Sequence, residues 1–420
     1  MRCVTRPCDR MRALRRVVGI LCDRGHSPAV RPLRTMKSMN GNLDLSQRPL
    51  VVIWETTQAC DLACVHCRAC AQPKRSLLEL TTEEAERFIR DVADLRPPIF
   101  ILTGGDPLKR IDIYHLVEYA ASLGLRPAMT PSVTRLLTQT AIEELKKAGL
   151  SRLAVSLDGS QPKLHDSFRG VPGAFFRTLE AIRWANDAHL PIQVNTCITK
   201  RNLHDLDNMA ALLREFRIVL WSAFFLVPTG RGQTADLPTP QEFEAAFSDL
   251  NRLSREVPFK IKTTEAQHYR RFLLQHRPRL ADHWVGESIP GVLPINDGKG
   301  FVFVSHTGEV FPSGFLPISA GSVREQSLAS IYRDSPLLRS LRDSSNLKGK
   351  CGVCEFKDIC GGSRARAYAM TGDVFAQEPC CIYQPGKWAG SSRGTARIGE
   401  AAWIQERTSM FAAGAGDTKP

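Results

Sequence analysis

From residue 50 to about residue 230, short runs of apolar and β-branched residues alternate with longer stretches of helical apolar spacing. The short runs predict strands, and the longer periodic stretches predict amphipathic helices. We expect strands at residues 51–57, 99–104, 126–131, 153–158, 192–199 and 220–227. We expect helices near residues 82–95, 110–123, 138–148, 174–189 and 203–216.

The residues at the ends of these stretches agree with the assignment. Thr81 and Glu84 have the spacing of a capping box that opens the first helix. Gly124 and Gly149 stand where the second and third helices should stop. Because strands that alternate with helices pair in parallel through right-handed crossovers, the pattern predicts an α/β fold with a partial (β/α)6 TIM-type barrel.

Polar segments, half of them glycine-containing, lie at the carboxyl ends of the predicted strands, where barrels of this type carry their chemistry. In chain order they are residues 60–67, 103–107, 130–132 and 156–159, then Asn195 with Thr196, then residues 228–232. All of these segments are expected on one rim of the barrel. The sequence therefore predicts a site on that rim.

Composition narrows the class of protein. The chain has 420 residues, of which 43% are hydrophobic and 24% charged, as in globular proteins. The net charge is +13, but residues 1–36 hold nine arginines against two aspartates, so the remainder is only mildly basic. Binding of nucleic acid is therefore not expected. We find neither an apolar run that could span a bilayer nor a secretory signal, and we expect a cytoplasmic protein without membrane partners.

The first cysteine group has the spacing CxxxCxxC, formed by Cys60, Cys64 and Cys67. Thiolates are soft ligands that suit zinc and iron–sulfur clusters. Most electron-transfer clusters use four cysteines, so three thiolates would leave one iron of a four-iron cube open. Cys70 is a fourth nearby thiol. If it bound the cluster it would close that iron, and we expect it to be a bystander.

This cysteine loop, followed by Gly104-Gly105-Asp106-Pro107 after the second strand, resembles the radical S-adenosylmethionine (SAM) superfamily over roughly residues 50–230. The resemblance implies that Cys60, Cys64 and Cys67 hold a 4Fe-4S cluster and that SAM chelates its fourth iron. It implies that the glycine-rich loop binds the methionine amino group. His66 stands where the superfamily often has an aromatic residue. The candidates for contacts with the sugar or carboxylate of SAM are Ser132, Ser156, Asp158 and Asn195.

The second cysteine group, CxxCx5C followed by a cysteine pair, resembles the SPASM extension of many radical SAM enzymes. Such extensions usually carry two auxiliary clusters, but Ser313 and Arg364 stand where further cysteine ligands are expected. The resemblance therefore implies one auxiliary 4Fe-4S cluster, with zinc as the alternative. Its expected ligands are Cys351, Cys354, Cys360 and one of Cys380 or Cys381, with Cys381 preferred.

Composition and pattern divide the chain into five parts. We expect a basic, disordered arm at 1–49, the radical SAM partial barrel at 50–235, a connecting region at 236–299, a SPASM-like, cysteine-rich Fe–S extension at 300–385 and a flexible tail at 386–420. The connecting region holds a predicted strand at 259–264, and the extension opens with a predicted hairpin at 300–314. For the arm, an upstream start codon or a transit peptide remains an alternative.

The resemblance implies a radical SAM oxidoreductase or lyase. It would cleave SAM reductively to a 5′-deoxyadenosyl radical, take hydrogen from a peptide or tetrapyrrole-like substrate, and need an external one-electron reductant of the flavodoxin or ferredoxin type. An iron–sulfur electron-transfer or sensor protein without radical chemistry is the alternative. Glu265, His268 and Tyr269 are the catalytic candidates. Further polar residues that could line the pocket are Lys262, Arg270, Arg271, Asp297, Lys299, His306, Arg364 and Arg366.

Overall fold

The computed structural model describes residues 44–276 and 293–387. Most of the predicted arm and tail therefore lies outside the described residues, as does part of the connecting region. No helix of the described residues is long and apolar enough to cross a membrane.

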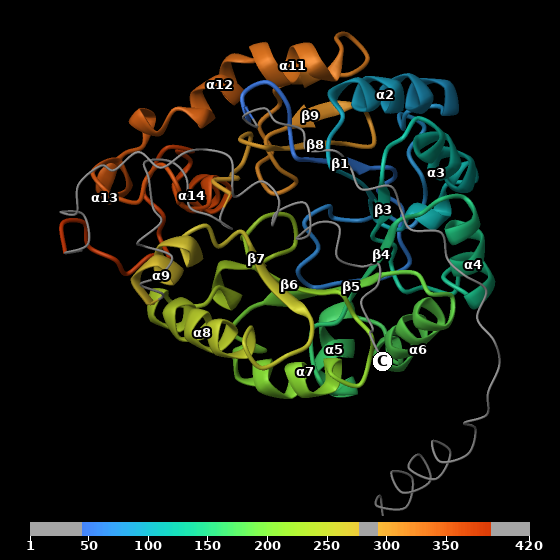
Figure 1. Cartoon of the computed structure of the whole chain (residues 1–420), viewed down its shortest axis with the longest axis horizontal. Coiled ribbons are helices and arrows are strands. Elements are labelled where there is room, and N and C mark those ends of the chain that lie inside the picture. The colour runs from blue at the N-terminus through green and yellow to red at the C-terminus, as the bar shows by residue number, and fades with distance from the viewer. Residues whose placement is uncertain (1–43, 277–292, 388–420) are drawn as a thin grey trace, which may run out of the picture. The chain divides into compact units, whose positions relative to one another are not determined.

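Seven parallel strands follow one another in chain order across the sheet, and the predicted α/β partial barrel is confirmed (Figure 1). They are β1 (Val51–Glu55), β2 (Ile99–Thr103), β3 (Pro127–Met129), β4 (Arg152–Ser156), β5 (Ile192–Ile198), β6 (Leu220–Phe225) and β7 (Lys260–Thr264). The six strands expected for the barrel are all present. The strand expected in the connecting region is β7, and it pairs in parallel with β6. The barrel is therefore larger than six strands.

Helices cover the outside of this strand layer (Figure 1). They are α2 (Thr82–Leu95), α3 (Ile113–Ser122), α4 (Gln139–Lys147), α5 (Pro162–Arg169), α6 (Ala174–Asp187), α7 (Leu206–Leu213), α8 (Pro240–Leu253) and α9 (Tyr269–His276). Thr81 and Glu84 form the predicted capping box of α2. The helix expected from residue 110 begins at Ile113, because a short 3-10 turn, η1 (Pro107–Lys109), precedes it.

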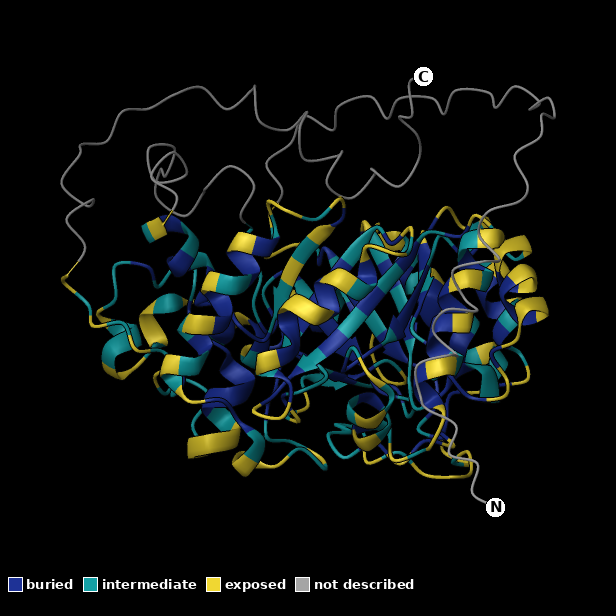
Figure 2. Ribbon diagram, turned by 90° about the horizontal axis from the view of Figure 1, so that it is seen from below, coloured by how far each residue is buried: buried dark blue, intermediate teal, exposed yellow. Residues whose placement is uncertain are grey.

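Alternating side chains of each strand face opposite sides. In β2, Phe100 and Leu102 are fully buried in the core, and Phe100 lies 6.2 Å from Phe88 of α2, measured between ring centroids. Ile99 and Ile101 point the other way and line a central cavity. Figure 2 shows the result, with buried residues along the strands and exposed residues on the outer faces of the helices. The strands therefore present one set of side chains to the core and the other to the site.

The extension begins inside the same sheet. The predicted hairpin is present as β8 (Phe301–Val304) and β9 (Glu309–Phe311), and β8 pairs in parallel with β1. Gly308 in its turn has φ +90°, a conformation that glycine adopts without strain. A short strand, β10 (Gly321–Ser322), completes a sheet of ten strands. The helices of the extension are α11 (Leu328–Asp334), α12 (Pro336–Arg342), α13 (Gly349–Gly352) and α14 (Arg364–Thr371).

A buried arginine joins the extension to the barrel. Arg366 of α14 forms an ion pair with Glu378 at 3.1 Å and donates to the carbonyl of Leu226 at 3.2 Å. Both side chains of the ion pair are almost completely buried. Arg364 is also buried and donates to the carbonyls of Val374 and Ala376. Neither arginine lines the central cavity, so their placement differs from the pocket-lining role expected for them, and both hold the extension together instead.

Candidate active site and cysteine clusters

The centre of the barrel holds a cavity of about 980 Å³. Its walls are the inward-facing strand residues, and its rim is built from the loops at the carboxyl ends of the strands. Cys60, Cys64 and Cys67 all line it. The expectation of one polar rim at the strand ends therefore agrees with the geometry, and the cavity extends from that rim down into the barrel.

Backbone contacts fix the first cysteine loop on several sides. The Cys60 amide donates to the carbonyl of Gln72 at 2.8 Å, and the Val65 amide donates to the carbonyl of Phe168 at 3.0 Å. The Arg231 amide donates to the carbonyl of Cys67 at 2.9 Å. The loop is thereby held from α5 and from the loop that follows β6. Such support keeps three thiols in place without a fourth protein ligand.

Polar and charged side chains lie close to the cysteine thiols. Cys60 Sγ lies 3.1 Å from Ser132 Oγ, and Arg169 Nη1 lies 3.7 Å from Cys64 Sγ. Cys70 is exposed and does not line the cavity, as a bystander thiol would be placed. The three remaining thiols suit a 4Fe-4S cluster with one open iron.

The glycine-rich loop packs directly on the cysteine loop. The Gly105 amide donates to the carbonyl of Thr57 at 2.8 Å. A methyl group on Gly105 would lie 2.4 Å from the carbonyl oxygen of Ala59, and one on Gly104 would lie 2.4 Å from that of Thr57. Any side chain at these positions would push the two loops apart. The glycines are therefore required by the close approach of the backbones.

We expect Gly105→Ala to weaken SAM-dependent chemistry strongly, because the added methyl group must displace the backbone that carries the cysteines. Overpacking of this kind also costs about 1–3 kcal/mol of unfolding free energy. Thermal unfolding and iron content of the reconstituted protein measure the effect. Gly124→Ala is the control, since φ is +80° there but no atom lies within 4 Å of the added methyl. Equal SAM cleavage by both variants would contradict the packing argument.

Asp106 and Pro107, the other two residues of the glycine-rich loop, lie on its side away from the cavity. Asp106 is fully buried, accepts from the Leu108 amide at 3.2 Å and from Thr134 Oγ1 at 2.8 Å, and does not line the cavity. Burial raises the pKa of Asp106 to about 6. Pro107 begins η1 and is also absent from the cavity wall. Gly104 and Gly105 are thus the residues of this loop that face the cavity.

The four predicted sugar or carboxylate contacts all line the cavity. Ser132 donates to the carbonyl of Gly105 at 2.6 Å, which ties the third strand end to the glycine-rich loop. Asn195 accepts from Gln193 Nε2 at 2.7 Å. Asp158 pairs with Arg169, whose charge lowers the pKa of Asp158 against the effect of burial. Asp158 also accepts from the Cys197 amide at 2.8 Å, so it positions neighbours as well as facing the cavity.

His66 faces the cavity with an unsatisfied ring nitrogen. Its Nδ1 is buried and has no hydrogen-bond partner, and its ring lies edge-on to Phe168 with 5.4 Å between centroids. Burial lowers the pKa of His66 to about 4, so the imidazole is neutral at pH 7. A neutral ring at this position leaves one nitrogen available to a ligand in the cavity.

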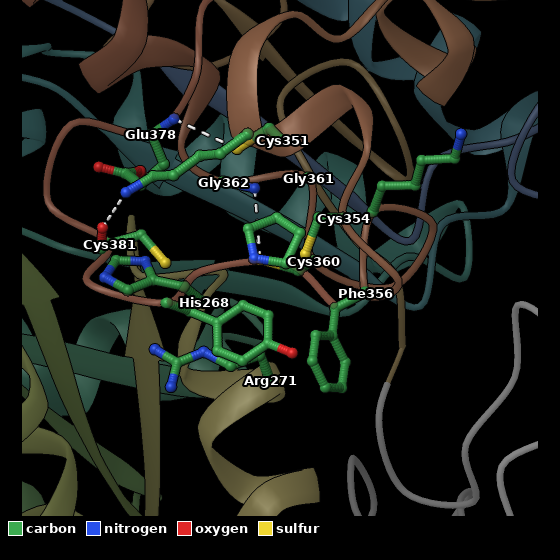
Figure 3. A pocket seen from close by; sticks show the side chains of 14 residues that line it. His268, Arg271, Cys351, Cys354, Phe356, Cys360, Gly361, Gly362, Glu378 and Cys381 are labelled. Atoms are coloured by element: carbon green, nitrogen blue, oxygen red, sulfur yellow. Dashed lines mark hydrogen bonds between the residues drawn. The ribbon is translucent and has the colours of Figure 1, made fainter. Parts of the chain in front are cut away.

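The second cysteine group lines a separate pocket in the extension. Figure 3 shows Cys351, Cys354, Cys360 and Cys381 around this pocket, together with His268. Cys380 is buried and does not line it; its Sγ faces the carbonyl of Pro238 at 4.0 Å. The geometry favours Cys381 as the fourth thiolate. Among the described residues, no three His, Cys, Asp or Glu side chains converge closely enough for a single metal ion.

The structure separates the three catalytic candidates. Glu265 and Tyr269 line the central cavity, whereas His268 lines the pocket of the second cysteine group. His268 is fully buried, packs against Phe243 and Phe247, and has no hydrogen-bond partner at either ring nitrogen. Burial lowers its pKa to about 3. A role in proton transfer within the central cavity is therefore favoured for Glu265 and Tyr269 over His268.

The environment of Glu265 favours the protonated form of its carboxyl group. It has φ +54°, and it accepts from Ser363 Oγ at 2.6 Å. Burial and the nearby Asp297 raise the pKa of Glu265 to about 8. A carboxyl group that is protonated at pH 7 can donate a proton or a hydrogen bond.

The remaining predicted pocket residues divide between the cavity and other sites. Lys262, Arg270 and Asp297 line the cavity, while Arg271, His306 and Lys299 do not. Arg271 pairs with Glu244, and His306 Nδ1 lies 2.9 Å from Glu55 Oε2. The sequence did not point to Arg126, Arg152 or Arg169, although all three line the cavity. Arg169 also contacts both Asp158 and Cys64. Their positions at strand starts and on an unpredicted helix gave no signal.

Comparison with known proteins places the chain in a family. Residues 54–213 match the model of the radical SAM superfamily. The AdoMet-dependent heme synthase of Methanosarcina barkeri is 42% identical over 349 residues, which covers 82% of this chain and 99% of that protein. The PqqA peptide cyclase of Rhizobium meliloti is 29% identical, covering 80% of this chain and 88% of that protein.

A solved structure with a similar fold supports the family assignment. Streptococcus suis SuiB bound to S-adenosylmethionine matches with a TM-score of 0.65 and 17% identity, covering 80% of this chain and 78% of that one. The family match, the extensive sequence identity and the three cavity-facing cysteines lead to one conclusion. The chain belongs to the radical SAM superfamily and is an enzyme that uses a 4Fe-4S cluster and S-adenosylmethionine.

Proposed function

We propose that the enzyme acts on a tetrapyrrole with carboxylate side chains and that its product is haem. The observation that carries the proposal is the 42% identity to a haem synthase along nearly the whole of that protein. Identity to the peptide cyclase is lower, at 29%. A cavity of about 980 Å³ is large enough for a drug-sized or larger ligand beside SAM.

Several residues of this chain would prepare the cofactors. Cys60, Cys64 and Cys67 would hold the cluster, with Gly104 and Gly105 giving the methionine part of SAM a close backbone approach. When bound, the cluster and SAM supply a 5′-deoxyadenosyl radical that can take hydrogen from unactivated carbon. Apolar wall residues, among them Ile53, Ile101 and Phe303, would keep water away from that radical.

The chemistry of haem indicates what the substrate must lose. Haem carries vinyl groups where iron-coproporphyrin III carries propionates. A propionate becomes a vinyl group when it gives up a hydrogen atom to the radical, carbon dioxide to solution and one electron to an acceptor. The hydrogen leaves in 5′-deoxyadenosine, so each step balances if an electron acceptor is present. Haem keeps two of the propionates and needs the step twice.

We propose the second cysteine group as the site of that acceptor. Cys351, Cys354, Cys360 and Cys381 would hold one auxiliary 4Fe-4S cluster, and an external one-electron reductant of the flavodoxin or ferredoxin type would serve the first cluster. Zinc suits four thiolates equally well but accepts no electron. A protein with zinc there would need another route for the electron.

Anaerobic turnover with iron-coproporphyrin III, SAM and dithionite tests the proposal. We expect haem and 5′-deoxyadenosine to form together, detected by liquid chromatography with mass spectrometry. Omitting SAM is the control and should give neither product. Formation of 5′-deoxyadenosine with an unchanged tetrapyrrole would contradict the proposal and favour a peptide substrate. Absence of SAM cleavage in fully reconstituted protein would favour an electron-transfer or sensor protein.

A further inference from the structure

Besides Lys260 at the start of β7, three cations line the strand wall of the cavity. Arg126 directly precedes β3, Arg152 is the first residue of β4, and Lys262 lies in the middle of β7. The cysteine loop lies at the opposite, carboxyl end of the strands. Ser156 on the rim lies four positions beyond Arg152, which is about 13 Å along a strand. A ligand of that length could reach both ends.

The three side chains have no partner of opposite charge. Within the described part of the chain, no ion pair or side-chain hydrogen bond involves them. The acids on the cavity wall are committed elsewhere. Asp158 pairs with Arg169, Glu265 accepts from Ser363, and Asp297 accepts from the Ala365 amide at 3.0 Å. The cations therefore face the cavity without a protein counter-charge.

The cations also act on one another. Burial and the charge of Arg126 lower the pKa of Arg152, and burial and the charge of Arg152 lower the pKa of Lys262 to about 8. Arg126 and Lys262 are exposed and Arg152 is half-buried, and all three line the cavity. Like charges grouped on one wall repel one another, and an anion bound between them removes that repulsion. The fold thus keeps an arrangement that a bound anion would stabilise.

The surrounding wall shows what kind of anion fits. Ile99, Leu220 and Phe301 add an apolar lining to the cavity, and Ser151, Gln193 and Ser254 add polar side chains. A flat apolar ring with carboxylates at its edge matches such a wall. A small inorganic anion would leave the apolar surface uncovered, and SAM is expected at the rim.

We infer that Arg126, Arg152 and Lys262 form a carboxylate-binding subsite that holds propionate side chains of the tetrapyrrole and turns its opposite edge toward SAM. The inference rests on the proposed function. Guanidinium groups suit carboxylates, because their paired N–H donors match the two carboxylate oxygens. The subsite would select a substrate that carries carboxylates on more than one side, one set for recognition and another for reaction.

Binding of iron-coproporphyrin III to the reconstituted, unreduced protein tests the subsite, followed by absorbance titration. We expect Arg152→Gln and Lys262→Met each to weaken binding about 10- to 100-fold, because a hydrogen bond to a charged group is lost. Arg152→Lys should restore part of the lost affinity for iron-coproporphyrin III. Arg87→Gln, on the exposed face of α2, is the matched control and should bind as the native protein does.

A second ligand separates the subsite from general damage. The carboxamide of the same iron porphyrin lacks the charges, so native protein and Arg152→Gln should bind it equally and weakly. Iron content and SAM binding, each compared between Arg152→Gln and the Arg87→Gln control, report separately on the first site. If native protein turns over iron-coproporphyrin III but Arg152→Gln binds it with native affinity, the subsite is wrong and the proposed function stands. If native protein binds no tetrapyrrole but binds an acidic peptide, both fail.

Discussion

Cys64→Ala is expected to abolish the formation of 5′-deoxyadenosine and to halve the iron content, from about eight to about four atoms per chain if two four-iron clusters form. Cys64 is almost fully buried, lines the cavity and lies 3.7 Å from Arg169 Nη1. Two remaining thiols cannot hold a cube that already has one iron without a protein ligand. Iron analysis and chromatography of the anaerobic reaction measure both effects.

Cys70→Ala is the matched control for this prediction. Cys70 lies three residues beyond Cys67, is exposed and does not face the cavity. We expect its removal to change neither the iron content nor SAM cleavage. Loss of the cluster in Cys70→Ala with retention in Cys64→Ala would reverse the ligand assignment. It would also favour the reading of the chain as an electron carrier with a closed cluster.

Substitution of one cysteine of the pair Cys380-Cys381 is expected to have the second large effect on activity. We expect Cys381→Ser to lose the auxiliary cluster, leaving about four irons per chain. Haem formation should stop, because the electron released with carbon dioxide has no acceptor, while SAM is still cleaved. Cys381 lines the pocket with Cys351, Cys354 and Cys360, which is the geometric basis for the prediction. Iron content, electron paramagnetic resonance and product analysis measure it.

Cys380→Ser differs from this variant by one position and is its control. The Cys380 thiol faces the carbonyl of Pro238 and lies outside the pocket, so we expect native iron content and haem formation. If Cys380→Ser lost the cluster and Cys381→Ser kept it, the choice between the two thiols would be wrong. Zinc in place of the missing iron in native protein would overturn the auxiliary cluster itself.

Features set by local pattern could be predicted from the sequence. The six strands of the barrel, the capping box at Thr81 and the turn at Gly308 depend on residues close together in the chain. The cysteine loop and Gly105 were recognisable because close backbone approach and three soft ligands leave a fixed spacing. The preference for Cys381 over Cys380 also agrees with the pocket geometry.

Features set by distant contacts could not be predicted. The pairing of β8 with β1 joins residues about 250 positions apart, and nothing local indicates it. α5 has eight residues with only His165 and Phe168 buried, which is too little periodicity for a helix prediction. Yet α5 carries Arg169 and supports the cysteine loop.

Charged residues were the most difficult to assign. Arg152 at the start of a strand resembles a solvated strand end, but in a barrel the same position faces the interior. Arg364 and Arg366 resemble pocket residues and are instead buried in the extension. His268 and Tyr269 are adjacent in the sequence and face different cavities, because successive side chains at the start of α9 point in different directions.

Transfer of hydrogen from the tetrapyrrole is the central claim, and isotope labelling tests it most directly. Iron-coproporphyrin III deuterated in its propionate methylenes is incubated anaerobically with the enzyme, SAM and dithionite. We predict that deuterium appears in 5′-deoxyadenosine while haem forms. Unlabelled 5′-deoxyadenosine, formed beside intact deuterated substrate, would contradict the account.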